Sequence, residues 1–161
     1  MSLARAGLAG SIAFAVFAAD QISKWWVFER LDLRGLGVIE VLPPWLSFHL
    51  AWNPGINFGL FASDARWTKW ALAGLALVVA AGVLIWAGRR AGDRLFALGA
   101  GLLAGGALGN ALDRVLHGAV ADFLNVSCCG IRNPFAFNIA DIAIFLGALL
   151  VAWRSGSPTP S

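Results

Sequence analysis

The sequence predicts a mainly α-helical membrane protein, a bundle of four transmembrane helices with a small extracytoplasmic antiparallel β-sheet. Composition is the first reason: 59% of the 161 residues are hydrophobic and 13% are charged, whereas about a quarter of the residues in a soluble domain carry a charge. Four long apolar stretches are the second reason, and a short cationic link between two of them is the third. A chain of this length leaves no room for a second fold, so we expect one membrane-embedded domain over residues 1–161.

Crossing the hydrocarbon core of a bilayer takes about 17 to 25 apolar residues. Four stretches meet this requirement, at 8–27, 68–87, 95–112 and 137–153. The positive-inside rule places the arginine-rich link 88–94 in the cytoplasm, and Arg5 and Arg154 agree with that orientation. Four crossings then put both termini in the cytoplasm and leave two extracytoplasmic segments, 28–67 and 113–136.

The first apolar stretch has a second interpretation, as a cleaved secretory signal. It follows Arg5 and contains the small residues Ala18 and Ala19, as a signal peptide would. Apolar character continues through residues 25–27, which favours a transmembrane helix. N-terminal sequencing of the purified protein distinguishes the two.

Two β-rich stretches lie in the first extracytoplasmic segment. Residues 37–41 and 45–52 are rich in β-branched and aromatic side chains and are separated by Pro43-Pro44, a pattern typical of an antiparallel hairpin. Asn53-Pro54-Gly55 ends the second stretch. We expect this sheet, apolar on one side, to lie on the membrane surface beside the bundle.

The third apolar stretch carries Gly101, Gly105 and Gly109 at intervals of four. This spacing makes a narrow stripe on one side of a helix, along which another helix can approach closely. We interpret the stripe as a packing surface.

Three predicted helices carry a polar pair near their extracytoplasmic ends. The pairs are three or four residues apart and so share a helix face: Asp20 with Lys24, Asn110 with Asp113, and Asn138 with Asp141. An ionisable residue within a span costs about 2.5 to 3.5 kcal/mol, so its default explanation is functional. The alternative is that these polar groups only hold the helices together. That role explains a single polar pair more readily than three pairs at the same depth in the membrane.

Several kinds of site are not indicated. Cys128 and Cys129 are adjacent with no third cysteine, which fits neither a zinc site nor a disulfide framework, and they form either a vicinal disulfide or two thiols. His49 and His117 lack metal-ligand spacing. The net charge of +3 is too small to indicate a nucleic-acid surface. We therefore expect no metal, no cofactor and no nucleic acid.

Carboxylates remain as the candidate chemistry. Two carboxylates that share one proton can hydrolyse a peptide bond, one activating water and the other hydrogen-bonding the carbonyl oxygen. Two aspartates have a cation close by in sequence: Asp20 has Lys24 and Asp113 has Arg114. Such a cation would keep the carboxylate ionised, which suits a structural role. Asp122 and Asp141 have no cation within four residues, so elimination favours them as the catalytic pair.

Two other classes of function stay open on these residues alone. Perturbed carboxylates also occur in proton relays and in structural networks. The chain would then be a small transporter or proton channel, which would show ion flux in liposomes, or a non-enzymatic assembly factor that tolerates Asp to Asn changes.

Five sequence blocks occur in a fixed order between the first and last spans. They read Asp20-Gln21-Ile22-Ser23-Lys24, Asn53-Pro54-Gly55-Ile56-Asn57-Phe58-Gly59, Gly105-Gly106-Ala107-Leu108-Gly109-Asn110-Ala111-Leu112-Asp113-Arg114, Val120-Ala121-Asp122-Phe123 and Phe137-Asn138-Ile139-Ala140-Asp141. In this order they resemble bacterial lipoprotein signal peptidase, also called signal peptidase II. No single block is specific, but the set spans the chain from Asp20 to Asp141.

The resemblance implies an intramembrane aspartyl endopeptidase, a multi-pass hydrolase of the bacterial cytoplasmic (inner) membrane with its active site toward the extracytoplasmic side. Such an enzyme removes the signal peptide from prolipoproteins and cuts before a cysteine that bears a diacylglyceryl group. The implied partners are lipid-modified prolipoproteins, membrane lipids and, as inhibitors, cyclic peptide antibiotics such as globomycin.

The resemblance also implies roles for individual residues. The catalytic pair would be Asp122 and Asp141, in agreement with the elimination above. The positions that match the substrate cleft are Asn53, Gly55, Asn110, Arg114 and Asn138. The positions that match polar support of the site are Asp20, Lys24 and Asp113.

The sequence departs from the family pattern at three positions. Ile56 and Asn57 stand where small residues are common, and Ile142 stands where Ser is frequent. These departures bear on loop shape and substrate preference rather than on the reaction. The hairpin and the segment 53–61 are expected to cover the cleft as a lid that excludes water.

Overall fold

The computed structural model describes residues 3–55, 67–90, 92–128 and 133–156. Its elements follow in the order α1 (Leu3–Glu29), α2 (Leu33–Leu36), β1 (Val38–Leu42), β2 (Leu46–Asn53), α3 (Thr68–Arg89), α4 (Arg94–His117), β3 (Val120–Val126) and α5 (Ile139–Ser155). The fold is mainly helical with a small antiparallel sheet, as predicted. Helices α3 and α4 are long and apolar enough to cross a membrane, and they coincide with the second and third predicted spans.

Helix α4 is the centre of the bundle and packs against α1, α3 and α5. The predicted glycine stripe makes the close approach of α1 possible. A Cβ atom on Gly101 would lie 2.7 Å from the Cβ atom of Ile12, and one on Gly105 would lie 2.5 Å from the carbonyl oxygen of Ala13. Both distances are too short for side chains larger than hydrogen, so the interpretation of the stripe as a packing surface is confirmed.

Local capping sets the ends of the helices that carry the polar pairs. The carboxylate of Asp93 accepts a hydrogen bond from the backbone N–H of Phe96 and starts α4. Gly118, with φ of 82°, ends α4 in the left-handed conformation that glycine tolerates. Asn138 starts α5 in a capping box with Asp141.

The sheet has the strand order β1-β2-β3, and both pairings are antiparallel. Strands β1 and β2 form the predicted hairpin, with Ile39 opposite Phe48. Strand β3 was not predicted. It leaves α4 after Gly118 and runs back along β2, with Asp122 opposite Ala51.

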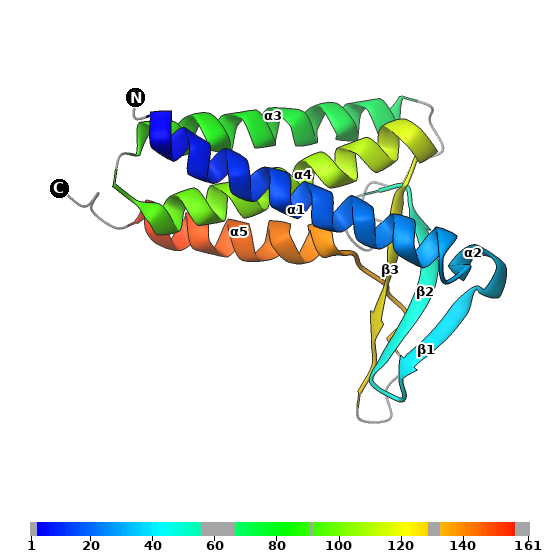
Figure 1. Ribbon diagram of the computed structural model, residues 1–161. Helices are drawn as coiled ribbons and strands as arrows, with labels where there is room; N and C mark the ends of the chain where they lie inside the picture. The colour runs from blue at the N-terminus through cyan, green and yellow to red at the C-terminus, as the bar shows by residue number, and fades with distance from the viewer. Residues whose placement is uncertain (1–2, 56–66, 91, 129–132, 157–161) are drawn as a thin grey trace.

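The sheet extends from the end of the bundle opposite to the end where α1 begins and α5 finishes (Figure 1). The part of the sheet next to the bundle packs against the last turn of α1 and against α2. Val27, Phe28, Leu33 and Phe123 are buried in this contact. The ring of Phe48 meets the ring of Phe123 at 5.7 Å, nearly perpendicular. This small core fixes β3, and therefore Asp122, relative to the helices.

Candidate active site

The ends of α1, α4 and α5 and the middle of β3 meet where the sheet joins the bundle (Figure 1). The three polar pairs predicted from sequence converge there. Hydrogen bonds join α1 to α5 from Ala140 to Asp20, α4 to α5 from Asn110 to Asp141, and α4 to β3 from Ala121 to Asp113. Groups far apart in the chain thus form one polar cluster among apolar helices.

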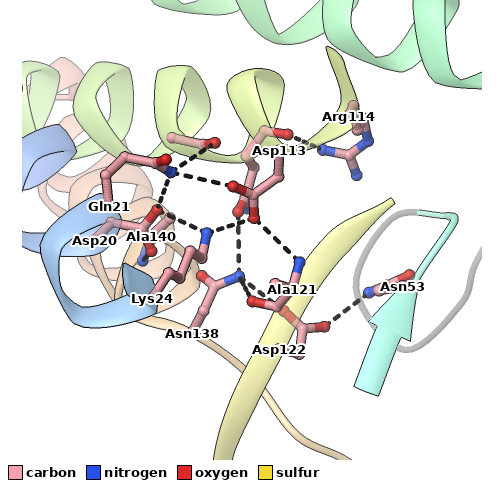
Figure 2. A network of polar contacts seen from close by, with 12 residues as sticks. Asp20, Gln21, Lys24, Asn53, Asp113, Arg114, Ala121, Asp122, Asn138 and Ala140 are labelled. Carbon is pink, nitrogen blue, oxygen red and sulfur yellow. Dashed lines mark hydrogen bonds and ion pairs between the residues drawn. The ribbon is translucent and has the colours of Figure 1, made fainter. Parts of the chain in front are cut away.

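Asp122 projects from β3 and is 3% exposed. Its Oδ2 atom accepts a hydrogen bond from Nδ2 of Asn53 at 3.2 Å, and its Oδ1 atom accepts one from Nδ2 of Asn138 at 2.7 Å (Figure 2). The pairing of β2 with β3 brings Asn53 to this carboxyl, because the last residue of β2 lies opposite the first residue of β3 beside the helices. Two amide groups therefore orient Asp122.

Asp141 lies in the first turn of α5. Its Oδ1 atom accepts a hydrogen bond from Nδ2 of Asn110 at 2.8 Å, and its Oδ2 atom accepts one from the backbone N–H of Asn138 at 3.3 Å. Its own N–H donates to Oδ1 of Asn138 at 2.8 Å. The capping box that starts α5 therefore also fixes the position of this carboxyl.

Asp122 and Asp141 line one cleft of about 350 Å³ whose other walls are mostly apolar, formed by Ala136, Phe137, Ile142, Phe145 and Leu146. Asn138, which is fully buried, joins the two carboxyls: its side chain donates to Asp122 and its backbone donates to Asp141. The structure thus brings together the two aspartates that elimination favoured.

The environment of Asp122 favours its protonated form. Burial, followed by the negative charge of Asp141, raises the pKa of Asp122 to about 7, although the hydrogen bonds from Asn53 and Asn138 and the charge of Lys24 act in the opposite direction. A carboxyl with a pKa near 7 is protonated in about half of the molecules at neutral pH and can donate that proton during a reaction.

Beside the cleft lies a buried ionic cluster. The Nζ atom of Lys24 is 2.7 Å from Oδ2 of Asp20 and 2.7 Å from Oδ2 of Asp113. Gln21 completes the cluster, since its Nε2 atom donates to Asp20 and to Asp113, each at 3.1 Å (Figure 2). Sequence reasoning missed Gln21, although it lies one turn before Lys24 on the same helix.

One sequence-based pairing is wrong. We expected Arg114 to be the cation that accompanies Asp113, but Lys24 of α1 has that role. Consecutive residues on a helix point in different directions, so Asp113 and Arg114 do not face one another. The guanidinium of Arg114 instead donates to the carbonyl oxygens of Asn110 at 3.0 Å and Gly55 at 2.6 Å.

The residues predicted for the substrate cleft surround the acids. Asn53, Asn110 and Asn138 donate to them directly, and Gly55 is held by Arg114 and by a 3.1 Å hydrogen bond from its N–H to Oδ1 of Asn53. A second cavity of about 190 Å³ opens between α3, α4 and α5 and reaches Asn110 and Arg114. The remaining residues that line it are apolar.

Arg114 is 7% exposed and its Nε atom is buried without a hydrogen-bond partner in the described part of the chain. A buried donor without a partner costs free energy, about 1 to 3 kcal/mol. Arg114 also lines the second cavity.

A family model for signal peptidase II matches residues 12–156. The chain belongs to the signal peptidase II family. The five sequence blocks had indicated this family, and that prediction is confirmed.

Individual relatives agree. A lipoprotein signal peptidase of Methylorubrum extorquens is 38% identical over 160 residues, which cover 99% of this chain and 91% of the relative. One of Pseudomonas aeruginosa is 38% identical over 142 residues, which cover 88% and 83%.

Two solved structures, both described as bacterial membrane enzymes determined by the in meso method, share the fold. One has a TM-score of 0.73 at 24% identity and covers 93% of this chain and 90% of the other. The second has a TM-score of 0.71 at 25% identity and covers 95% of each chain.

Some predictions fall on residues outside the described ranges. These are most of the proposed lid at 53–61, the departures at Ile56 and Asn57, and the state of Cys129. Ile142, the third departure, lies in the described part and lines the cleft beside Asp141. In the described ranges, no group of three or more His, Cys, Asp and Glu side chains could hold a metal ion.

Proposed function

We propose that this signal peptidase is an intramembrane aspartyl endopeptidase that removes signal peptides from diacylglyceryl-modified prolipoproteins and cuts before the lipidated cysteine. One observation carries the proposal: Asp122 and Asp141 line a single apolar-walled cleft and are joined through Asn138. The catalytic pair is Asp122 and Asp141. Membership of the family supports peptide-bond hydrolysis as the reaction. The two carboxyl groups in the cleft are the groups proposed to catalyse it.

In this mechanism the pair shares one proton at neutral pH. Asp122, with a pKa of about 7, is the protonated member and hydrogen-bonds the carbonyl oxygen of the scissile amide, while ionised Asp141 takes a proton from water. The water oxygen bonds to the carbonyl carbon and the oxyanion receives the proton of Asp122. When the intermediate collapses, the C–N bond breaks, the leaving nitrogen takes the proton that Asp141 acquired, and one hydroxyl of the intermediate returns its proton to Asp122 as the carbonyl forms, which restores the starting pair.

The residues proposed to bind the substrate are Asn53, Gly55, Asn110, Arg114 and Asn138. The apolar cavity between α3, α4 and α5 suits a hydrocarbon part of the substrate, and its polar end is formed by Asn110 and Arg114. One lipidated peptide could thus bind across both cavities.

The proposed location is the cytoplasmic (inner) membrane, crossed four times by α1, α3, α4 and α5. Large apolar side chains on the outer surfaces of α1 and α5, such as Phe14 at 72% and Phe145 at 64% exposure, suit lipid contact. Arg89, Arg90, Arg94 and Arg154 gather at the end of the bundle opposite the sheet. The positive-inside rule then puts both termini in the cytoplasm and the acids at the extracytoplasmic side.

The sheet lies on the membrane surface in this arrangement. It extends sideways from the bundle (Figure 1), and its far end exposes Leu42 at 60%, Trp45 at 54% and Val126 at 48%. Exposed tryptophan and aliphatic side chains are typical of groups that sit at the lipid interface. The cleft would then open at the level where the lipidated cysteine of a substrate lies.

The test is incubation of the purified protein in detergent with a diacylglyceryl-modified precursor, with and without globomycin. We expect cleavage before the modified cysteine, inhibition by globomycin, and a loss of at least about 1,000-fold in rate for Asp122→Asn and Asp141→Asn. Glu40→Gln, on the exposed edge strand, is the control and should cleave normally.

Substantial turnover by either Asn variant refutes the catalytic pair. Ion flux in liposomes without precursor cleavage favours the transporter alternative.

A further inference from the structure

Each proposed catalytic aspartate follows a backbone amide that is held by a buried carboxylate. The N–H of Ala140, the residue before Asp141, donates to Oδ1 of Asp20 at 3.1 Å. The N–H of Ala121, the residue before Asp122, donates to Oδ2 of Asp113 at 3.1 Å. The two anchoring carboxylates come from different helices, α1 and α4.

Lys24 joins the two anchors. Its ammonium group lies 2.7 Å from one oxygen of Asp20 and 2.7 Å from one oxygen of Asp113 (Figure 2). All three side chains are buried, with exposures of 0% for Asp20, 4% for Lys24 and 2% for Asp113. Ion pairs shielded from water keep a fixed geometry far better than exposed pairs, which solvent screens.

We propose that Lys24 is a positioning residue that sets the separation of the Asp122 and Asp141 carboxyl groups. A continuous series of contacts runs from the backbone before Asp141 through Asp20, Lys24 and Asp113 to the backbone before Asp122. Asn138 joins the same two acids from the cleft side. The two links together hold α5 and β3 at a fixed spacing. The inference rests on the proposed function, since it concerns the pair named there.

Electrostatics explains why a cation is needed between the anchors. Two buried carboxylates whose oxygens both contact one ammonium would repel each other if it were removed, and a buried charge left without its partner is strongly destabilising. Without Lys24 we expect the anchors to separate and the acids to move with them. A displacement of about 1 Å in a catalytic group costs on the order of 100-fold in rate.

The decisive variant preserves charge. Asp20, Lys24 and Asp113 together carry a net charge of −1, and the double variant Asp20→Asn with Lys24→Met also carries −1, because Asp113 alone is charged. The asparagine that replaces Asp20 keeps an oxygen that can accept from Ala140, so both amide anchors survive while the lysine bridge is lost. Between the anchors only the uncharged contacts of Gln21 remain. Lys24→Met alone leaves two buried carboxylates without their cation. If that single variant does not fold, the double variant is used instead.

Lys69→Met is the matched control. It removes the other lysine of the chain, which lies over the ring of Trp70 in α3 and outside the ionic cluster.

The readouts are kcat, KM, the pH dependence of the rate and the melting temperature, measured with the lipidated precursor below the melting temperature. For the double variant we expect kcat at its own pH optimum to fall about 100-fold with KM unchanged, while the pH midpoint of activity rises because Lys24 no longer acts to lower the pKa of Asp122. Lys69→Met should match the unmodified protein in kcat.

Three results would overturn the inference: a folded double variant with normal kcat, a loss of melting temperature with kcat preserved, or a shifted pH midpoint with full kcat at the new optimum. Asp122→Asn, assayed alongside, separates this failure from failure of the proposed function. If Asp122→Asn is active, the catalytic pair is wrong; if it is inactive while the double variant is normal, only the role of Lys24 is wrong.

Discussion

The side-chain amide of Asn138 donates to Oδ1 of Asp122 at 2.7 Å, and the same residue caps the helix whose first turn carries Asp141. The start of α5 and the orientation of Asp122 therefore depend on one side chain. An asparagine is suited to both tasks, because its oxygen caps the helix while its nitrogen reaches the neighbouring strand.

Substitutions of Asn138 should separate these two tasks. A serine side chain caps a helix well but is too short to reach Asp122. An alanine side chain can neither cap the helix nor hydrogen-bond to Asp122. We expect Asn138→Ala to lower the free energy of unfolding by about 1 to 2 kcal/mol and Asn138→Ser by much less. Both should reduce kcat, by about 10- to 100-fold, because Asp122 loses its closest donor. Melting curves and precursor cleavage measure the two effects, and a serine variant with normal kcat would contradict the role of the amide.

The pH dependence should report the proton on Asp122. Because the pKa of this carboxyl is raised to about 7, a rise in pH through neutrality ionises it and removes the proton that the mechanism requires. We expect kcat/KM to fall about tenfold per pH unit above this value. Rates measured from pH 5 to 9 with a lipidated peptide test this, after a check that the protein stays folded throughout. A rate that stays level up to pH 9 would argue that Asp122 is not the acid.

Gly109 couples helix packing to the ionic cluster. A Cβ atom at this position would lie 2.7 Å from Oδ2 of Asp20, the oxygen that pairs with Lys24. We expect Gly109→Ala to lower the free energy of unfolding by about 1 to 3 kcal/mol and to reduce cleavage as well. Gly82→Ala in α3 is the matched control, since a Cβ there would meet nothing within 4 Å. It should be neutral or stabilise by up to about 1 kcal/mol, and equal behaviour of the two variants would show that the contact has no importance.

At the opposite end of the bundle, Asp93 should affect stability alone. It caps α4 and lies 3.0 Å from Nε of Arg154. Burial acts to raise the pKa of Asp93, but the hydrogen bond from Phe96 N–H and the charge and hydrogen bond of Arg154 outweigh it, so the pKa is lowered. A lowered pKa stabilises the fold above the ordinary value of 3.8 and the benefit disappears as pH falls through the folded value.

We therefore expect Asp93→Ala to destabilise by about 1 to 2 kcal/mol at pH 7 and less near pH 3, with kcat unchanged. Asp93→Asn should lose only the ion pair, because asparagine also caps helices. Melting temperatures across this pH range provide the measurement. A reduced kcat in either variant would contradict the separation of this end from the site.

Local patterns made much of the fold predictable. The helices at 68–89 and 94–117 follow from apolar length and from the arginine-rich link between them. The hairpin follows from two β-rich stretches on either side of Pro43-Pro44. The convergence of the polar pairs could also be predicted, because helical spacing and topology put them at one level.

Contacts between distant segments could not be predicted in the same way. Strand β3 has no clear strand pattern, since it buries the polar residues Asp122 and Asn125, and it becomes a strand by pairing with β2. The partner of Asp113 comes from another helix, so proximity in sequence suggested Arg114 wrongly. Gln21 was overlooked for the same reason, because its acceptor Asp113 lies 92 residues away.

The span of these contacts along the chain has a consequence for biosynthesis. The hydrogen bond from Ala140 to Asp20 joins residues 120 positions apart, and Asn138 and Asp141 form the start of α5. A nascent chain that has emerged only as far as its third long helix therefore lacks Asp141 and all of the groups that α5 contributes. The polar cluster can therefore assemble only after α5 has been synthesised and has packed against α1 and α4.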